Sequence, residues 1–292
     1  RLPRNILRSE IQEIETAGVE IRLNTRVESV DSLFQQGYQA IFLAIGAHEE
    51  MKLGVEGEDL SRVIGCVEFL RRFNLGEQVK VGNRVGVIGG GNVAIDSARV
   101  ALRLGAKTVI IFYRRTQNEM PAEPIEVEQA LEEGVEIMFL VAPSKIYRKN
   151  DALKLELVRM ELGEADASGR RRPVPIKGSE FVTQLDTLIA AIGERPEVPA
   201  GFQTELGRGN VLKVNEDLST GRRGVFAGGD CVSGPALVIS AIAAGRKVAQ
   251  SIDHYLGGKG DITEQLVPAE EAMIWLEEEI PVGGRLAAIS YL

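Results

Sequence analysis

The sequence predicts an α/β fold, on three observations. Residues 85–116 read as a strand, a glycine-rich turn, a helix and a second strand. Residues 39–47, QAIFLAIGA, are nearly all apolar, which is typical of a strand covered on both faces in a parallel sheet. Residues 225–256 begin with a short apolar strand and continue through glycines into a long helical pattern. Repeated β-α-β units of this kind indicate a parallel sheet with covering helices.

The composition limits the class of protein. The 292 residues, 44% hydrophobic, suffice for one large or two medium domains. The net charge of -8 argues against a nucleic-acid groove or an anionic membrane surface as the main partner. No apolar run approaches the roughly 18 residues that span a bilayer, and no cleavable leader opens the chain, so we expect a cytoplasmic protein without a membrane span. Cys66 and Cys231 form no C-x-x-C pair, which argues against a disulfide reductase.

The first third of the chain predicts alternating helices and strands. Apolar residues at helical spacing predict a helix at 6–17 that stops at Gly18, and the alternation of VEIRLNTRV predicts a strand at 19–27. After the strand at 39–47, residues 67–74 predict a helix, and a polar connector follows to residue 83. Because the chain begins at Arg1, inside a helix-forming stretch, we expect a fragment or a processed piece.

The middle of the chain changes pattern. A predicted helix at 124–134 and a predicted strand at 135–143 complete the β-α-β pattern. Residues 144–181 predict an antiparallel meander, because strand-forming stretches alternate with turn-forming residues. Within it, RRRP at 170–173 is interpreted as a solvated loop, with docking of an acidic partner as the alternative. LDTLIAAIGERP at 185–196 echoes the earlier YQAIFLAIGAHE, and this echo predicts two related crossovers between domains.

The β-α-β unit at residues 85–116 predicts a dinucleotide site. Gly89, Gly91 and Ala94 satisfy G-x-G-x-x-A directly after a predicted strand. The first glycine allows a sharp turn, the second lets the backbone approach a pyrophosphate, and the alanine lets helix and strand pack closely. The phosphates would lie on free N–H groups at the positive end of the helix. The alternative is a tight turn without a ligand.

The end of the next strand favours NADPH over NADH. An NAD site usually carries an acidic side chain there, whereas this strand ends in Arg114 and Arg115, and no acid occurs between Asp96 and Glu119. Two guanidiniums suit a 2′-phosphate, which a carboxylate would repel. The alternative is a pair of solvated arginines.

The stretch VFAGGDC predicts part of a second cofactor site. Asp230 follows Gly229 between a strand end and a helix start, where it can accept a hydrogen bond from a sugar-like hydroxyl while the helix N-terminus faces a phosphate. This arrangement suits the ribityl chain and pyrophosphate of a flavin. Asp230 could equally be a helix cap.

Three motifs in order resemble one family. VIGGGNVAIDSARVALRLGA, YRRTQNEMPA and VFAGGDC followed by GPALVISAIAAGRKVAQSID resemble the NADPH-dependent flavoproteins that include the small subunit of bacterial glutamate synthase. The resemblance covers residues 1 to about 257 and extends to modules of dihydropyrimidine dehydrogenase and electron-bifurcating transhydrogenases. It implies an FAD domain interrupted by an NADPH domain, with hydride passing from nicotinamide to flavin and electrons then passing to iron-sulfur clusters.

The resemblance also implies site residues. Those carried over are Gly89, Gly91, Asn92 and Ala94 for the NADPH phosphates, Arg114 and Arg115 for the 2′-phosphate, Gly229 and Asp230 for FAD, and Gly46 and Gly193 for the two A-I-G crossovers beside the cofactors. No catalytic side chain is expected, because hydride transfer is the cofactors' own reaction. No metal site is expected either, since His48 and His254 have no matching ligand cluster.

The predicted organisation is two Rossmann-like dinucleotide-binding domains, with the NADPH domain inserted into an incomplete FAD domain. The boundaries are 1–79 for the first FAD portion and crossover, 80–192 for the NADPH domain, 193–258 for the FAD return segment and 259–292 for a tail. The family's first flavin fingerprint would precede Arg1, so the FAD pocket is expected to be incomplete in this chain. An iron-sulfur or amidotransferase-type partner is expected. The competing interpretation is a non-catalytic nucleotide-binding segment of a larger electron-transfer complex.

Overall fold

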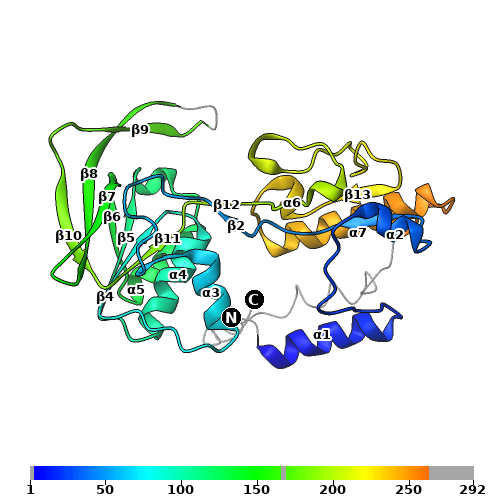
Figure 1. Ribbon diagram of the computed structural model, residues 1–292, viewed down its shortest axis with the longest axis horizontal. Coiled ribbons are helices and arrows are strands. Elements are labelled where there is room, and N and C mark those ends of the chain that lie inside the picture. Colours follow the sequence, from blue (N-terminus) through cyan, green and yellow to red (C-terminus); the bar gives the residue numbers. More distant parts are fainter. Residues whose placement is uncertain (1–2, 166–168, 263–292) are drawn as a thin grey trace, which may run out of the picture. The chain divides into compact units, whose positions relative to one another are not determined.

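The computed structural model describes residues 3–165 and 169–262 (Figure 1). The chain divides into two compact units, and each is described by itself. Of the described residues, the first comprises 3–41, 199–203 and 249–262, and the second comprises 42–165, 169–198 and 204–248.

A five-stranded parallel sheet forms the centre of the second unit. Its strand order is β3 (Val63–Gly65), β11 (Thr187–Ala190), β4 (Arg84–Ile88), β5 (Thr108–Tyr113) and β6 (Glu136–Phe139), and every neighbouring pair is parallel. Helices α4 (Asn92–Arg103) and α5 (Pro124–Glu132) provide the crossovers of the consecutive strands β4, β5 and β6, and α3 (Cys66–Asn74) follows β3. The predicted parallel sheet and the helices at 67–74 and 124–134 are therefore confirmed.

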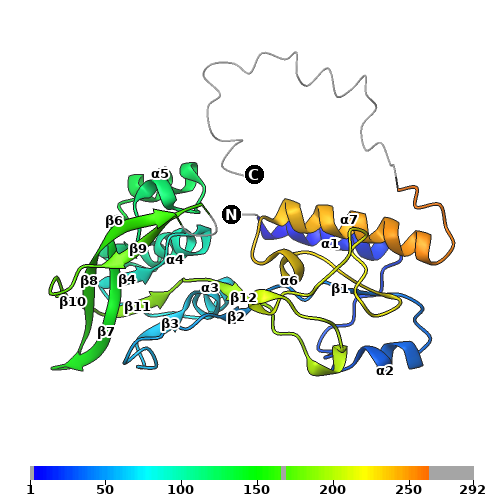
Figure 2. The same ribbon diagram turned by 90° about the horizontal axis from the view of Figure 1, so that it is seen from above.

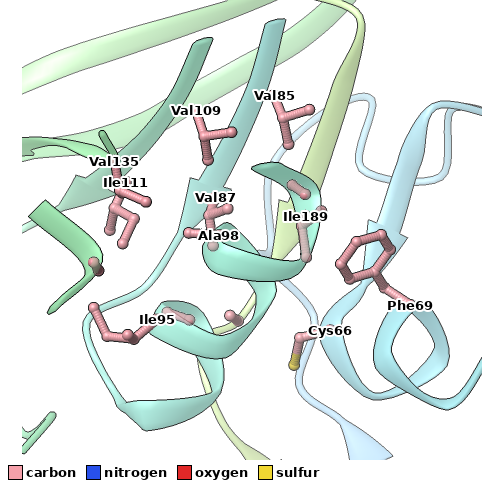
Figure 3. Packing of buried hydrophobic residues seen from close by; sticks show 14 of the residues in the cluster. Cys66, Phe69, Val85, Val87, Ile95, Ala98, Val109, Ile111, Val135 and Ile189 are labelled. Atoms are coloured by element: carbon pink, nitrogen blue, oxygen red, sulfur yellow. The ribbon is translucent and has the colours of Figure 1, made fainter. Parts of the chain in front are cut away.

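The two faces of this sheet bury different partners because successive side chains of a strand point to opposite sides. Val85, Val87, Val109 and Ile111 belong to a core cluster with α3, α4 and α5, as Figure 3 shows. Ile88, Ile110 and Phe112 belong to a second cluster, on the antiparallel strands that follow β6. Apolar residues therefore fill every position of β5 after Thr108, as is typical of a strand covered on both faces.

The antiparallel sheet is built around one long strand (Figure 2). Strand β8 (Ala152–Ala165) pairs with β7 (Val141–Lys149), β9 (Arg171–Pro175) and β10 (Phe181–Leu185), all antiparallel. Leu153, Leu155 and Leu157 alternate along β8 with less buried residues, and all three lie in the second core cluster. The predicted antiparallel arrangement of residues 144–181 is confirmed.

Two predictions for this region are wrong in detail. The run at 170–173 is not a loop, because β9 begins at Arg171 and pairs with β8 from Met160 to Ala165. Its arginines suggested solvation, but an edge strand needs only one partner and its side chains here remain mostly exposed. The strand at 135–143 is interrupted at Leu140, whose φ of 55° ends β6 and starts β7.

Two predictions for the first 47 residues also differ from the structure. Residues 19–27 form no strand in the described chain, and Leu23 is 78% exposed. An alternating pattern forms a strand only where a neighbouring strand accepts its hydrogen bonds, and the described chain places none beside these residues. The strand at 39–47 is limited to β1 (Ile41–Leu43), which pairs with β13 (Val225–Ala227). Phe42 is 37% exposed, so β1 is not covered on both faces.

The remaining elements are short or belong to the chain's ends. They are α1 (Arg4–Thr16), α2 (Val30–Gln35), β2 (Glu49–Glu50), β12 (Glu194–Arg195), α6 (Asp230–Ser233), α7 (Val238–Tyr255) and the 3-10 turns η1 (Gln117–Glu119), η2 (Ala200–Phe202) and η3 (Arg208–Asn210). The helices predicted at 6–17 and in 225–256 are thereby confirmed. None of the described helices is long and apolar enough to cross a membrane. Most of the predicted tail at 259–292 lies outside the described residues, and the domain boundaries stay a prediction.

Candidate dinucleotide-binding site

The turn after β4 requires glycine twice for the protein's own packing. Gly89 has a φ of 148°, and a Cβ atom there would lie 2.0 Å from the carbonyl oxygen of Ala191, the residue that follows β11. A Cβ atom at Gly90 would lie 2.4 Å from the Tyr113 ring on β5. The turn is therefore wedged between the ends of the two neighbouring strands.

Gly91 differs from both of these glycines. Its φ is -91°, and the nearest atom to an added Cβ would be Pro121 Cγ, 4.0 Å away. Gly91 is the N-cap of α4 and has no side-chain cap, while the first N–H groups of any helix lack intrahelical acceptors. The folded chain does not need glycine here for its own contacts. An open space above exposed helix N–H groups is what a phosphate requires.

Two of the predicted residues lie in the first turn of α4 and serve the scaffold. Ala94 is fully buried in the cluster that joins α4 to the parallel sheet, as predicted for close helix–strand packing. The side-chain oxygen of Asn92 accepts a hydrogen bond of 2.8 Å from the backbone N–H of Glu123, directly before α5. Asn92 therefore connects the starts of two helices, and its predicted contact with the phosphates stays a prediction.

The two arginines after β5 are not equivalent. Arg114 is exposed, whereas Arg115 is 4% exposed and its Nε donates a 2.7 Å hydrogen bond to the carbonyl oxygen of Arg171 on β9. A capping box follows at once, in which Thr116 and Glu119 bond each other's backbone or side chain. The hydrogen bond from Thr116 Oγ1 holds the pKa of the Glu119 carboxyl below its usual range. Arg114 is thus the more accessible guanidinium on a firmly held loop.

A cavity of about 720 Å³ lies over this turn. Its lining includes the predicted residues Gly89, Gly91, Asn92, Ala94, Arg114, Arg115 and Gly193. It does not include the predicted residues Gly46, Gly229 and Asp230. The cavity is also lined by residues that the sequence did not predict, among them Tyr113, Glu123 and Arg170. Only the arginine run gave a sequence signal for Arg170, and that run was interpreted as a loop.

The two A-I-G segments lead into paired strands. Strand β2 begins three residues after Gly46, and β12 begins directly after Gly193. The two strands pair antiparallel, with Arg195 opposite Glu49 and their side chains joined by an ion pair with an Nε–Oε2 distance of 2.8 Å. Gly193 has a φ of 125°, and its carbonyl oxygen accepts a 3.0 Å hydrogen bond from Met51 N–H. The internal echo in the sequence therefore marks two connections that lie side by side.

The same paired connections are attached to the start of α3. The Glu50 carboxylate accepts a 3.0 Å hydrogen bond from Glu68 N–H in the first turn of that helix. The Cys66 thiol donates to the Glu194 carboxylate at 3.2 Å. Burial, with Glu194 beside it, raises the pKa of the Cys66 thiol far above its ordinary value, so it stays protonated and serves as a donor.

The segment after β13 makes a tight turn into a short helix. Gly229 has a φ of 73° and is the N-cap of α6, so Asp230 is the first helical residue and not the cap. Asp230 is half-buried, and the long helix α7 begins only at Val238. Cys231 is fully buried and its thiol donates to the carbonyl oxygens of Leu43 and Gly228, at 3.3 and 3.2 Å. These contacts give Cys231 a role in the local packing.

A family model for pyridine nucleotide-disulphide oxidoreductases matches residues 3–245. The chain belongs to this family. Subunit beta of the NADP(+)-dependent formate dehydrogenase of Moorella thermoacetica is 44% identical over 287 residues, which are 95% of this chain and 40% of that protein. The glutamate synthase [NADPH] small chain of Escherichia coli K12 is 37% identical over 262 residues, 82% of this chain and 55% of that one. The predicted resemblance to the glutamate synthase small subunit is thus confirmed.

The solved structures agree on the fold. Mycobacterium tuberculosis FprA in complex with NADPH aligns with a TM-score of 0.69 at 20% identity, covering 87% of this chain and 72% of FprA. This likeness confirms the α/β fold with Rossmann-like domains. The chain spans about half the length of the curated relatives named above.

Proposed function

We propose that this oxidoreductase-family chain binds NADPH and takes part in hydride transfer between NADPH and FAD, with electrons passed to an iron-sulfur or other partner. The single observation that carries the proposal is the open space at Gly91, over the start of α4 and in one cavity with Arg114. A turn shaped only by packing would fill that space, as it does at Gly89 and Gly90. The names of the relatives support the choice of nucleotide.

The residues around the cavity offer one binding group for the pyrophosphate of NADPH and another for its 2′-phosphate. The N–H groups at the start of α4 would hold the pyrophosphate, since Gly91 leaves them accessible and the helix end is electropositive. Arg114 would bind the 2′-phosphate by charge-assisted hydrogen bonds. Bound nicotinamide supplies the hydride chemistry, and we assign no catalytic side chain to the protein.

For FAD the candidates are Gly229 and Asp230, with Gly46 and Gly193 at the crossovers. Gly229 adopts a positive φ and has no Cβ atom, so a ligand could approach its backbone closely. The half-buried Asp230 carboxylate would accept a hydrogen bond from a ribityl hydroxyl. The partner is proposed as an iron-sulfur or amidotransferase-type subunit, because relatives are named as subunits or chains of larger enzymes.

A second candidate function is a nucleotide-binding segment without catalysis of its own. The observation that favours it is the coverage, because the chain corresponds to 40% to 55% of the relatives named above. An absorbance spectrum of the purified chain before and after anaerobic NADPH separates the two. A flavin spectrum that bleaches supports the oxidoreductase, whereas a colourless chain that binds NADPH supports the segment.

The NADPH assignment is tested by Arg114→Ala. Loss of a charge-assisted hydrogen bond of about 1.5–3 kcal/mol predicts that the Kd for NADPH rises about 10- to 100-fold. The Kd for NADH should change less than about 2-fold, because NADH lacks the 2′-phosphate. Lys107→Ala is the matched control, since Lys107 is an exposed cation just before β5 whereas Arg114 lies just after it. Equal losses for both nucleotides in Arg114→Ala would refute the assignment.

A further inference from the structure

A third arginine lies at the same cavity. Arg170 lines the cavity together with Arg114 and Arg115, although it comes from the connection between β8 and β9 and not from the β-α-β unit. It is half-buried. The connection between two antiparallel strands thus contributes a cation to a cavity whose other arginines, Arg114 and Arg115, follow β5 of the parallel sheet.

Hydrogen bonds attach this part of the antiparallel sheet to the end of β5. Arg115 Nε donates to the carbonyl oxygen of Arg171 at 2.7 Å. The carbonyl oxygen of Arg115 accepts from Leu140 N–H at 3.2 Å, and that of Leu140 accepts from Met160 N–H on β8 at 2.8 Å. Since Arg115 is almost completely buried, its guanidinium connects the end of β5 to the start of β9.

The neighbouring arginines of the run have other roles. The Arg171 guanidinium turns back onto β8, where it donates to the carbonyl oxygens of Leu162 and Gly163. Arg172 is exposed and does not line the cavity. Of the three consecutive arginines, Arg170 is therefore the one that lines the cavity.

We propose that Arg170 is a second residue that binds the 2′-phosphate of NADPH, and that Arg115 is the positioning residue that holds β9 so that Arg170 reaches the cavity. The proposal rests on the proposed function. A terminal phosphate carries nearly two negative charges and three acceptor oxygens, more than one guanidinium satisfies. Arg114 and Arg170, from two different sheets, would bind it together. The chain would then select NADPH by a composite site and not by the β5 terminus alone.

The test is calorimetric titration of the full chain with NADPH, NADH and adenosine 2′,5′-bisphosphate. Arg170→Ala should raise the Kd for NADPH and for the bisphosphate about 10-fold and leave the Kd for NADH within about 2-fold. Arg172→Ala, which removes an equal charge from the adjacent position, should change all three by less than about 2-fold. Unchanged melting temperatures show that both variants are folded.

The positioning role is tested by Arg115→Lys. Lysine keeps the charge but lacks the Nε–H that bonds Arg171, so the Kd for NADPH should rise severalfold. In the double variant, Arg115→Lys should raise the Kd for NADPH little beyond the value for Arg170→Ala alone, because both changes remove the same contact between Arg170 and the 2′-phosphate. Additive losses would show that Arg115 acts by itself and overturn the positioning role.

The outcomes separate the two proposals. If Arg170→Ala binds NADPH like the wild type while Arg114→Ala loses affinity, the composite site is wrong and the proposed function stands. If the wild type binds NADPH and NADH equally, the NADPH preference itself fails, and the role of Arg170 fails with it.

Discussion

Replacing Gly91 by alanine separates the part of the turn that holds the fold from the part that is left for a ligand. The atom nearest to the added methyl would be Pro121 Cγ, at an ordinary contact distance of 4.0 Å, and the φ of -91° suits an alanine. Lower entropy of the unfolded chain favours the variant by about 0.4–1 kcal/mol. The poorer N-cap costs about 0.5–1 kcal/mol. We therefore expect the free energy of unfolding to stay within about 1 kcal/mol of the wild type.

Binding of NADPH should respond differently. The methyl occupies the space through which a pyrophosphate reaches the first N–H groups of α4, so at least one hydrogen bond to a charged group, about 1.5–3 kcal/mol, is lost. This corresponds to an increase in Kd of about 10- to 100-fold. The loss should be similar for NADPH and NADH, because both carry the pyrophosphate. That pattern distinguishes Gly91→Ala from Arg114→Ala.

The assay is urea unfolding in parallel with calorimetric titration, with Gly89→Ala as the matched control. There the methyl would lie 2.0 Å from the Ala191 carbonyl oxygen at a φ of 148°, so we expect a loss of about 3 kcal/mol or more in the free energy of unfolding. A Gly91→Ala variant that is as destabilised as Gly89→Ala, or that binds NADPH like the wild type, would refute this account of the turn.

Two further predictions concern stability. Leu155→Ala removes a fully buried side chain between the two sheets and should lower the free energy of unfolding by about 2–5 kcal/mol, whereas Val182→Ala, at a position 48% exposed, should cost far less; equal effects would contradict the assigned core. The hydrogen bond from Arg99 lowers the pKa of the Glu133 carboxyl from its ordinary 4.5, so its stabilisation is fully present above pH 4.5 and is lost as the pH falls towards the lowered pKa. The stability gap between wild type and Glu133→Gln should therefore narrow in urea unfolding between pH 7 and pH 3, and a gap independent of pH would rule out this contribution.

The arginines show how far local pattern carries. The sequence correctly placed Arg114 and Arg115 after a buried strand, but it treated them as a pair. Their different exposure depends on β9, which starts 56 positions after Arg115 and whose backbone accepts the hydrogen bond from that buried guanidinium. Such pairing depends on how two distant segments meet, which no local spacing records.

The errors have the same physical origin. Residues 19–27 alternate like a strand but have no strand partner in the described chain, and the arginine-rich run resembles a loop although β8 supplies it with a ladder. A strand is stabilised by its neighbours, whereas a helix closes its hydrogen bonds within itself. For that reason the helices at 6–17, 67–74 and 124–134 were predicted more reliably than the edge strands.

By itself the sequence determined the glycine-rich turn, the helices, the apolar strands of the parallel sheet and the family, because each depends on residues close together in the chain. Only the tertiary structure decided which glycine packs against protein and which faces open space, since Gly89 meets β11 and Gly91 meets no close neighbour. It also brought Arg170 to the cavity that holds Arg114. Contacts between distant segments follow from the packing of whole sheets, and the order of residues along the chain encodes that packing only through the complete fold.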